Sequence, residues 1–183
     1  MSHFTLIARD IPVEPLLGQI DAHPELWGSR GARQRGESPH RDATDIWLRY
    51  MDPVLIGRHD IMTRHESVWY PEALTLHGVL PIVHRLRGAI GVPLELGGVL
   101  LTRIPAGKCV YEHSDAGPWH AEWYNLKVWI PLRANEQCVN YVENESMVWR
   151  VGEGWHHSNM LPHRVVNGGE CERICLIVCF RKA

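Results

Sequence analysis

The sequence lacks any apolar run long enough to cross a bilayer, and nothing near its start resembles a secretory leader. The first residues, Met1 to Ile11, include the charged Arg9 and Asp10, whereas a signal peptide needs an uninterrupted apolar stretch at this place. A formal net charge of -2 leaves no dense basic surface, so nucleic acid is not indicated as a partner. We therefore expect a cytoplasmic protein that makes no membrane contact.

Cysteine is scarce and odd in number, which argues against a disulfide framework. There are five cysteines, and Cys171, Cys175 and Cys179 fall four apart within one apolar run. This pattern is typical of reduced, small core residues. Internal repeats and low-complexity tracts are also missing, and a length of 183 residues suits a single domain over 1–183 with a sizeable core.

Histidine and tryptophan are abundant, with twelve and eight copies. Residues 1–95 read as a mixed, partly helical N-terminal region. Apolar residues between 13 and 20 follow helical spacing with Asp10 as a candidate cap, and a second helical pattern covers Pro71 to Ile90, where Pro81 is a possible break and Gly91 a stop signal. Between the two patterns, a Gly-, Ser-, Pro- and Arg-rich stretch over 28–42 predicts a long surface loop suited to a lid or binding segment.

Residues 96–183 change character to short β-branched and aromatic runs separated by turn residues. The predicted strands are Val99 to Ile104, Lys108 to Glu112, Asn125 to Leu132, Cys138 to Val142, Ser146 to Val151, His163 to Asn167 and Arg173 to Phe180. Seven or eight strands at this spacing favour a jelly roll. In the third strand Lys127 and Trp129 alternate with apolar residues, so a polar interior is expected to face an apolar exterior. The predicted fold class is mainly β with N-terminal helices.

A metal site is predicted from His113, Asp115 and His163. Side chains two apart in a strand share a face, so the His-Ser-Asp triplet presents an imidazole and a carboxylate together. His163 opens a later strand and can supply the third ligand. Two histidines and one carboxylate on one face of an octahedron leave three positions open, which is the facial arrangement of non-haem iron(II) oxygenases.

The open positions suit a bidentate 2-oxo acid together with dioxygen, and such an acid needs a cation for its far carboxylate. Arg173 begins the last predicted strand, ten residues after His163, and its face-mates are small or apolar. A guanidinium directed inward from such a strand is costly to bury without an anion, and its fork matches a carboxylate. We therefore expect iron(II), 2-oxoglutarate and O2 as cofactor and co-substrates.

The stretch from Leu100 to Phe180 resembles the aspartyl/asparaginyl β-hydroxylase-like branch of the Fe(II)/2-oxoglutarate-dependent oxygenases, a family with a cupin-like double-stranded β-helix. The matching motifs are His113-Ser114-Asp115, Ile130-Pro131-Leu132 with Asn135, Gly152 to Asn159, His163-Arg164-Val165-Val166-Asn167 and Arg173. The segment from Ser38 to Asp42 and on through Ile46 to Arg49 is similar to the N-terminal region of some members.

The resemblance implies that His113 and His163 are the iron-binding histidines and that Arg173 holds the distal carboxylate of 2-oxoglutarate. Vertebrate-type aspartyl hydroxylases lack the carboxylate ligand, whereas Asp115 is present here, so this chain resembles the members with a complete triad. The implied reaction is hydroxylation of a substrate C–H bond with decarboxylation of 2-oxoglutarate to succinate.

The resemblance also assigns three further residues to the co-substrate pocket. Thr102 matches a hydroxyl-bearing position that assists the arginine. Lys127 and Trp129 stand where founding members of the family tend to have Arg and His, so the pocket differs in detail, although Lys127 still supplies positive charge. Structural roles for all three are the alternative, as strand formers, core residues or a lysine that reaches solvent.

The predicted partner is a small-molecule or peptide substrate. The Arg-rich loop is suited to closing over an anionic or planar group, such as an acidic side chain, a free amino acid or a nucleotide. We predict that Arg41 and Arg49 lie nearer to the active site than Arg30 and Arg33, and that His40 touches substrate. Tryptophans elsewhere can contribute, namely Trp27, Trp47, Trp69, Trp119 and Trp123.

Other readings remain open. His156 and His157 are neighbours and point to opposite faces of an extended chain, so we assign both to solvent or loop roles, and His120 to a loop. A cupin-type isomerase or a dioxygenase without 2-oxoglutarate would use the same barrel and would not need Arg173 as a carboxylate clamp. A jelly-roll binding module without catalysis is the third possibility.

Overall fold

The computed structural model describes residues 2–30, 33–55, 58, 66–115, 117, 119–120 and 124–182. The helices are α1 (Glu14–Ala22), α2 (Glu72–Thr75) and α3 (Val79–Ile90), with short 3-10 turns at Pro24–Leu26 and Pro53–Leu55. The strands are β1 (Thr5–Ala8), β2 (Thr44–Met51), β3 (Ser67–Trp69), β4 (Leu94–Ile104), β5 (Cys109–His113), β6 (Leu126–Arg133), β7 (Cys138–Val142), β8 (Glu145–Val148), β9 (Gly154–His156), β10 (His163–Asn167) and β11 (Arg173–Lys182).

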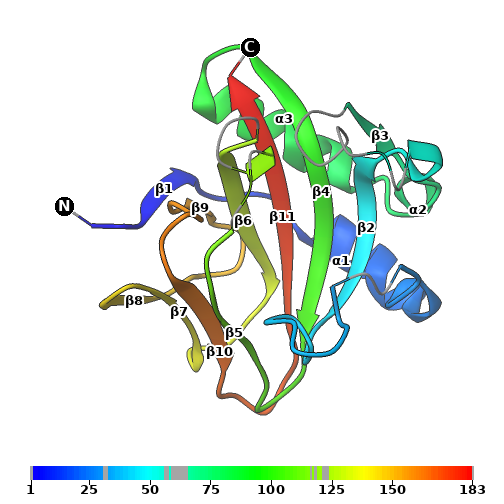
Figure 1. Ribbon diagram of the computed structural model, residues 1–183. Coiled ribbons are helices and arrows are strands. Elements are labelled where there is room, and N and C mark those ends of the chain that lie inside the picture. The colour runs from blue at the N-terminus through cyan, green and yellow to red at the C-terminus, as the bar shows by residue number, and fades with distance from the viewer. Residues whose placement is uncertain are drawn as a thin grey trace.

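The strands form two antiparallel sheets that face each other. The larger has the order β1-β9-β6-β11-β4-β2-β3 and the smaller the order β5-β10-β7-β8. In Figure 1, β11 lies at the centre of the large sheet between β4 and β6, α1 and α3 cover the back of that sheet, and the small sheet stands in front of it at lower left. This arrangement is the predicted double-stranded β-helix, so the fold class is confirmed.

Alternation along β11 and β6 separates a core from a cavity. Ile174, Leu176, Val178 and Phe180 of β11 join the main hydrophobic core under the helices, together with Val128, Ile130 and Leu132 of β6. The residues between them, including Lys127, Trp129 and Arg173, line a cavity of about 300 Å³ between the sheets. Successive side chains of a strand point to opposite faces. The apolar side chains therefore pack against the helices, and the side chains on the opposite face line the cavity. The expected lined cavity is therefore present, with Lys127 and Arg173 among otherwise largely apolar side chains.

The N-terminal half contributes more strand than the sequence indicated. Its strands β1, β2 and β3 complete the large sheet, and β2 pairs directly with β4. Only Ile46 and Leu48 of β2 face the core, so the apolar alternation is too short to stand out from the polar residues around it. Tertiary pairing with β4 supplies the hydrogen bonds that make this segment a strand.

The helices differ in detail from the prediction. The region expected to split at Pro81 instead breaks around Leu76, between α2 and α3. Pro81 is the third residue of α3, where the backbone N–H has no acceptor within the helix and its loss costs nothing. Gly91 ends α3 in the left-handed conformation (φ 71°) as expected. Asp10 does not cap α1, which begins after Val13 without a side-chain cap. None of the helices in the described part of the chain is long and apolar enough to cross a membrane.

Candidate metal centre and its cavity

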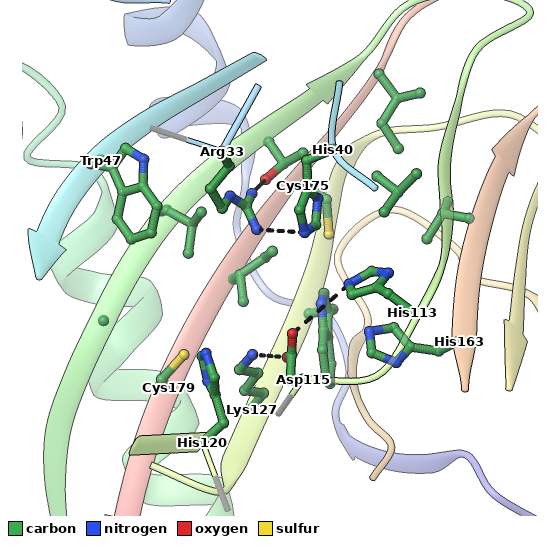
Figure 2. Close-up of a pocket in the computed structure, with 18 of the residues that line it drawn as sticks. Arg33, His40, Trp47, His113, Asp115, His120, Lys127, His163, Cys175 and Cys179 are labelled. Atoms are coloured by element: carbon green, nitrogen blue, oxygen red, sulfur yellow. Dashed lines mark hydrogen bonds and ion pairs between the residues drawn. The ribbon is translucent and has the colours of Figure 1, made fainter. Parts of the chain in front are cut away.

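Strand register brings the three predicted metal ligands together. His163, the first residue of β10, pairs with His113, the last residue of β5, across an antiparallel ladder. Asp115 follows two residues after His113, and one ligand atom from each of the three residues lies within 4.8 Å of the others. Figure 2 shows the three side chains converging at one side of the cavity. A single ion can therefore contact all three.

Backbone carbonyls orient both imidazole rings toward the same point. The Nδ1 atom of His113 lies 2.8 Å from the carbonyl oxygen of Tyr111, and Nδ1 of His163 lies 2.9 Å from that of Leu161. Each Nδ1 therefore carries the proton and donates it, which leaves the Nε2 lone pair for a metal. Burial lowers the pKa of His163 to about 4, so this ring is neutral at physiological pH.

Asp115 is held as a carboxylate by its neighbours. Its backbone N–H donates to the carbonyl of Asn159 at 2.8 Å, and Asn159 Nδ2 donates to its Oδ2 at 3.1 Å. The Lys127 ammonium forms an ion pair with the same carboxylate. Burial alone would raise the pKa of Asp115, but the charge and hydrogen bond of Lys127, together with the nearby imidazoles of His120 and His163, outweigh it and hold the pKa well below its usual range. The donor set of two imidazoles and one carboxylate fits a divalent first-row metal.

Arg173 is a buried cation in the same cavity. Its side chain is 3% exposed, and its Nη2 donates to Asn140 Oδ1 at 3.1 Å. The guanidinium also lies 5.9 Å from the ring of Trp149. Among the described residues, no carboxylate lies within ion-pair distance of Arg173. A buried guanidinium with only a neutral partner is suited to receiving an anion.

Thr102, Lys127 and Trp129 all line the cavity. The Thr102 hydroxyl, however, donates to Asp45 Oδ1 at 2.8 Å and accepts from Arg33 at 3.0 Å, so its bonds go to that pair and not to Arg173. Lys127 does not reach solvent, because its ammonium forms the ion pair with Asp115 at the candidate metal site.

One histidine expected in solvent or a loop role is part of the interior. His157 is 4% exposed and stacks on Trp129 with ring centroids 4.1 Å apart, and its ring lies 5.0 Å from that of His163. His157 follows β9 and lies outside any strand, so of the expected solvent or loop role only the solvent part was wrong. His156 instead directs Nδ1 to the carbonyl of Lys127 at 2.8 Å. The two rings do face different ways, as their adjacency predicted.

The expectations for the substrate side are met in part. His40 and Trp119 line the cavity, and so does His120, which had been assigned a plain loop role. Trp123 lies outside the described residues. The ring of His40 is 4.8 Å from that of His113, which places the loop over 33–43 beside the metal site.

The prediction that Arg41 and Arg49 lie nearer to the active site than Arg30 and Arg33 was wrong for Arg33, because Arg33 lines the cavity and Arg41 and Arg49 do not. Arg41 stacks on Tyr111 at 3.4 Å, because that ring offers a cation–π contact outside the cavity. The β2 register shifts between residues 47 and 49, which turns Arg49 away toward Trp69, 5.3 Å from its ring. Arg33 lines the cavity in their place.

The sequence interpretation missed Arg33, Asp45 and Tyr50 as site residues, whereas Trp47, one of the tryptophans expected to contribute, does line the cavity. Asp45 is 2% exposed and receives two hydrogen bonds of 2.8 Å from Arg33. Burial would raise the pKa of Asp45, but Arg33 and the hydrogen bonds to the carboxylate lower it on balance. The available signal was an acidic residue directly before Ile46 in a strand-like run, since such a carboxylate needs a partner when buried.

Comparisons with known proteins identify the family and the fold. The fold and the His-Asp-His group define a double-stranded β-helix protein with a candidate metal-binding group. The family model described as aspartyl/asparaginyl beta-hydroxylase matches residues 79–183, more than half of the chain. The chain belongs to this family, which confirms the predicted family and its enzyme class. A comparison with curated proteins found no match.

Three solved structures illustrate the likeness in fold. An oxidoreductase of the 2OG-Fe(II) oxygenase family from Burkholderia pseudomallei is 15% identical, with a TM-score of 0.60 over 99% of this chain and 85% of its own. A Trichoplax adhaerens prolyl hydroxylase in complex with a hypoxia inducible factor peptide is 14% identical, with a TM-score of 0.59 over 98% of this chain and 84% of its own. The viral collagen prolyl hydroxylase of Paramecium bursaria Chlorella virus-1, in a 2OG complex, is 13% identical, with a TM-score of 0.52 over 100% of this chain and 97% of its own.

Proposed function

We propose that this protein is an iron(II)- and 2-oxoglutarate-dependent dioxygenase that hydroxylates a C–H bond of an amino-acid, peptide or other small polar substrate. His113, Asp115 and His163 are the proposed iron ligands. The observation that carries the proposal is their convergence within 4.8 Å, with both Nδ1 atoms engaged by backbone carbonyls so that both Nε2 atoms face the same point.

Iron(II), 2-oxoglutarate and O2 are the cofactor and co-substrates of this class, and when bound they supply the oxidising power that converts a substrate C–H bond to C–OH with release of succinate and carbon dioxide. His113, Asp115 and His163 would supply three ligands to the iron and would leave its remaining positions to the co-substrates. The role of the protein is to hold those positions open, keep the ligands rigid and exclude water.

Arg173 is proposed to bind the distal carboxylate of 2-oxoglutarate. Its burial without an ion-pair partner in the described part of the chain supports this role, because a carboxylate would supply both the missing charge and a match for the fork. Lys127 and Trp129 line the same cavity. Lys127 pairs with Asp115 Oδ2, so the other oxygen, Oδ1, which lies 3.8 Å from His113 Nε2, would remain available to a metal ion.

A cytoplasmic location is proposed on a separate ground. All five cysteines are unpaired, and three of them are buried. This use of cysteine suits a reducing compartment.

The decisive experiment is an anaerobic titration of the purified protein with iron(II) and then 2-oxoglutarate. Chelation of iron by the 2-oxo acid produces a visible charge-transfer band, which we expect in the wild type and not in His163→Ala. His77→Ala is the matched control, because His77 is exposed and bonded to Gln19, so the band should persist. Failure of a folded, iron-loaded wild type to form the band would contradict the proposal.

Turnover then separates this function from the other readings. Succinate release is measured with free amino acids and with peptides that contain Asp, Asn or Pro. A cupin-type isomerase, or a dioxygenase without 2-oxoglutarate, would release no succinate and would be indifferent to Arg173→Met. A binding module would not turn over at all.

A further inference from the structure

The cavity contains a second arginine whose role the proposed function leaves unassigned. Arg33 belongs to the loop that precedes β2, and its guanidinium points into the cavity opposite Lys127 and His120 (Figure 2). The loop is fastened beside the metal site, since the N–H of Tyr111 in β5 donates to the carbonyl of Pro39 at 2.9 Å. A residue of this loop is therefore held over the reacting region.

A buried carboxylate fixes the orientation of Arg33. Its Nε and Nη2 donate to the two oxygens of Asp45 at 2.8 Å each, and Nη2 also donates to Thr102 at 3.0 Å. Gln34 Nε2 donates to Asp45 as well, at 2.8 Å. Asp45 thus occupies one edge of the guanidinium with a two-bond contact, which is the geometry that gives arginine a defined direction.

The other edge of the guanidinium has N–H donors that Asp45 and Thr102 do not use. Nη1 makes one long contact, 3.4 Å to His40 Nε2, and an arginine has five N–H donors in all. His40 Nδ1 and Trp47 Nε1 are buried and have no hydrogen-bond partner among the described residues. Both residues line the same cavity as Arg33, and Nη1 of Arg33 has N–H capacity left for a ligand with acceptor atoms.

Aromatic rings wall the same part of the cavity. Trp47 and Tyr50 have ring centroids 4.7 Å apart, and Tyr50 and Trp119 have centroids 5.0 Å apart. Trp119 is 3% exposed. This row of rings, called here the aromatic wall (Trp47, Tyr50 and Trp119), offers contact to a flat apolar group.

The size of the cavity limits the occupant. Its volume is about 300 Å³, at the lower end of the range of roughly 300–1,000 Å³ for small-molecule sites. On the proposed function, 2-oxoglutarate must occupy part of this space, beside Arg173. What is left accommodates a small molecule.

We propose that Arg33 binds a carboxylate of the substrate, that Asp45 positions Arg33 for this, and that the substrate is a small carboxylic acid whose flat apolar body lies against the aromatic wall. This inference rests on the proposed function. It adds a substrate class and two residues to it: Arg33 as a binding residue and Asp45 as a positioning residue.

The test compares acids with their neutral amides. Phenylacetate, 3-phenylpropanoate and indole-3-acetate, each with its matched amide, are titrated into the anaerobic complex with iron(II) and 2-oxoglutarate. Binding is read from the shift of the charge-transfer band and, independently of iron, from tryptophan fluorescence, since Trp47 and Trp119 line the cavity. We expect at least one acid to bind more tightly than its amide.

Arg33→Met should weaken the acid by about 10- to 100-fold and leave the amide unchanged, because the change removes charge-assisted hydrogen bonds while keeping the aliphatic bulk. Arg33→Lys keeps the charge without the fork and should restore part of the preference. Asp45→Asn should reduce the ratio of acid to amide affinity without changing 2-oxoglutarate affinity, which a purely structural role would not do. Arg41→Met is the matched control from the same loop, and its selectivity should equal that of the wild type.

The outcomes separate the two proposals. A charge-transfer band in every variant, with acid preference lost only in the Arg33 and Asp45 variants, supports the inference. The inference is overturned if the wild type does not prefer any acid, or if Arg33→Met keeps the preference, even though the band forms. A missing band in the wild type instead contradicts the proposed function, and the fluorescence titration still decides whether Arg33 binds acids.

Discussion

Replacing Arg173 by methionine should separate co-substrate binding from folding. Arg173 is 3% exposed and has a hydrogen bond of 3.1 Å to Asn140 and no ion-pair partner in the described part of the chain. Methionine fills much of the same space and cannot bind a carboxylate. The effects on 2-oxoglutarate affinity and on stability are therefore expected to differ.

The loss in 2-oxoglutarate binding follows from the contacts removed. A bidentate contact to a carboxylate consists of two charge-assisted hydrogen bonds, so its loss costs roughly 3–4 kcal/mol. This corresponds to a dissociation constant about 100- to 1,000-fold higher. The iron site itself is made by other residues, so iron affinity should be unchanged.

The stability of the metal-free protein should change little. Removing a buried, unpaired guanidinium relieves its desolvation cost, whereas Asn140 loses a partner at a cost of about 1–3 kcal/mol. These terms oppose each other, so we expect the free energy of unfolding to stay within about 2 kcal/mol of the wild type, or a melting temperature within roughly 8 °C.

The assay is the anaerobic titration with 2-oxoglutarate, followed by the charge-transfer band, together with thermal unfolding of the metal-free protein. Arg133→Met is the control, because Arg133 pairs with Asp21 and Glu172 outside the cavity. Wild-type 2-oxoglutarate affinity in Arg173→Met would refute the carboxylate-clamp argument. Loss of both affinity and fold would show that Arg173 is structural.

Three further predictions concern the ligands, the buried histidines and the glycines. Asn159→Ala should weaken metal binding about 10- to 100-fold, because the carboxylate ligand loses its orienting hydrogen bond. Burial lowers the pKa of His157 to about 3, against about 6.5 in an unfolded chain. As pH falls below 6.5, the unfolded chain therefore binds a proton at His157 that the folded chain does not bind, and this lowers the free energy of unfolding by about 2 kcal/mol at pH 5. His157→Phe should remove this part of the pH dependence. Gly97→Ala should destabilise the protein by about 1–3 kcal/mol, because the added Cβ would lie 2.3 Å from the ring of Tyr124. A Cβ at Gly88 in α3 would meet nothing within 4 Å, so Gly88→Ala should stabilise the protein by about 0.5–1 kcal/mol.

Each of these has a direct measurement. Metal affinity is followed by titration with cobalt(II), and an unchanged value in Asn159→Ala would show that the backbone contact alone orients the ligand. Urea unfolding of the chelator-treated protein at pH 7 and pH 5 tests the histidine argument, which a pH-independent difference between the wild type and His157→Phe would contradict. Melting temperatures of the two glycine variants should move in opposite directions; an unchanged or higher value for Gly97→Ala would count against the packing around Tyr124, and a lower value for Gly88→Ala would count against the helix-propensity argument.

Much of the C-terminal half could be predicted, because its information is local. The limits of β7 and β10 match the predicted runs, and β11 begins at Arg173 as expected. Alternation alone placed Lys127 and Trp129 opposite the apolar residues of β6. The N-terminal strands were missed since their apolar patterns are short and the partner strands that stabilise them lie far away in the sequence.

The choice among arginines could not be made from the sequence. Arg30, Arg33 and Arg41 lie in one loop with no periodicity to distinguish them. Each has found a different partner: Glu72 for Arg30, Asp45 for Arg33 and the ring of Tyr111 for Arg41. These three contacts determine the conformation of the loop, and they cannot be predicted from a sequence pattern.

The sequence by itself determined which residue types could bind a metal and which strand faces they occupy, because the two-residue period of a strand is a property of the backbone. Only the tertiary structure decided that His163 pairs with His113 across β5 and β10, that His157 is interior, and that Arg33 enters the cavity. These depend on strand register and on loop docking, which are settled by contacts between segments distant in the chain.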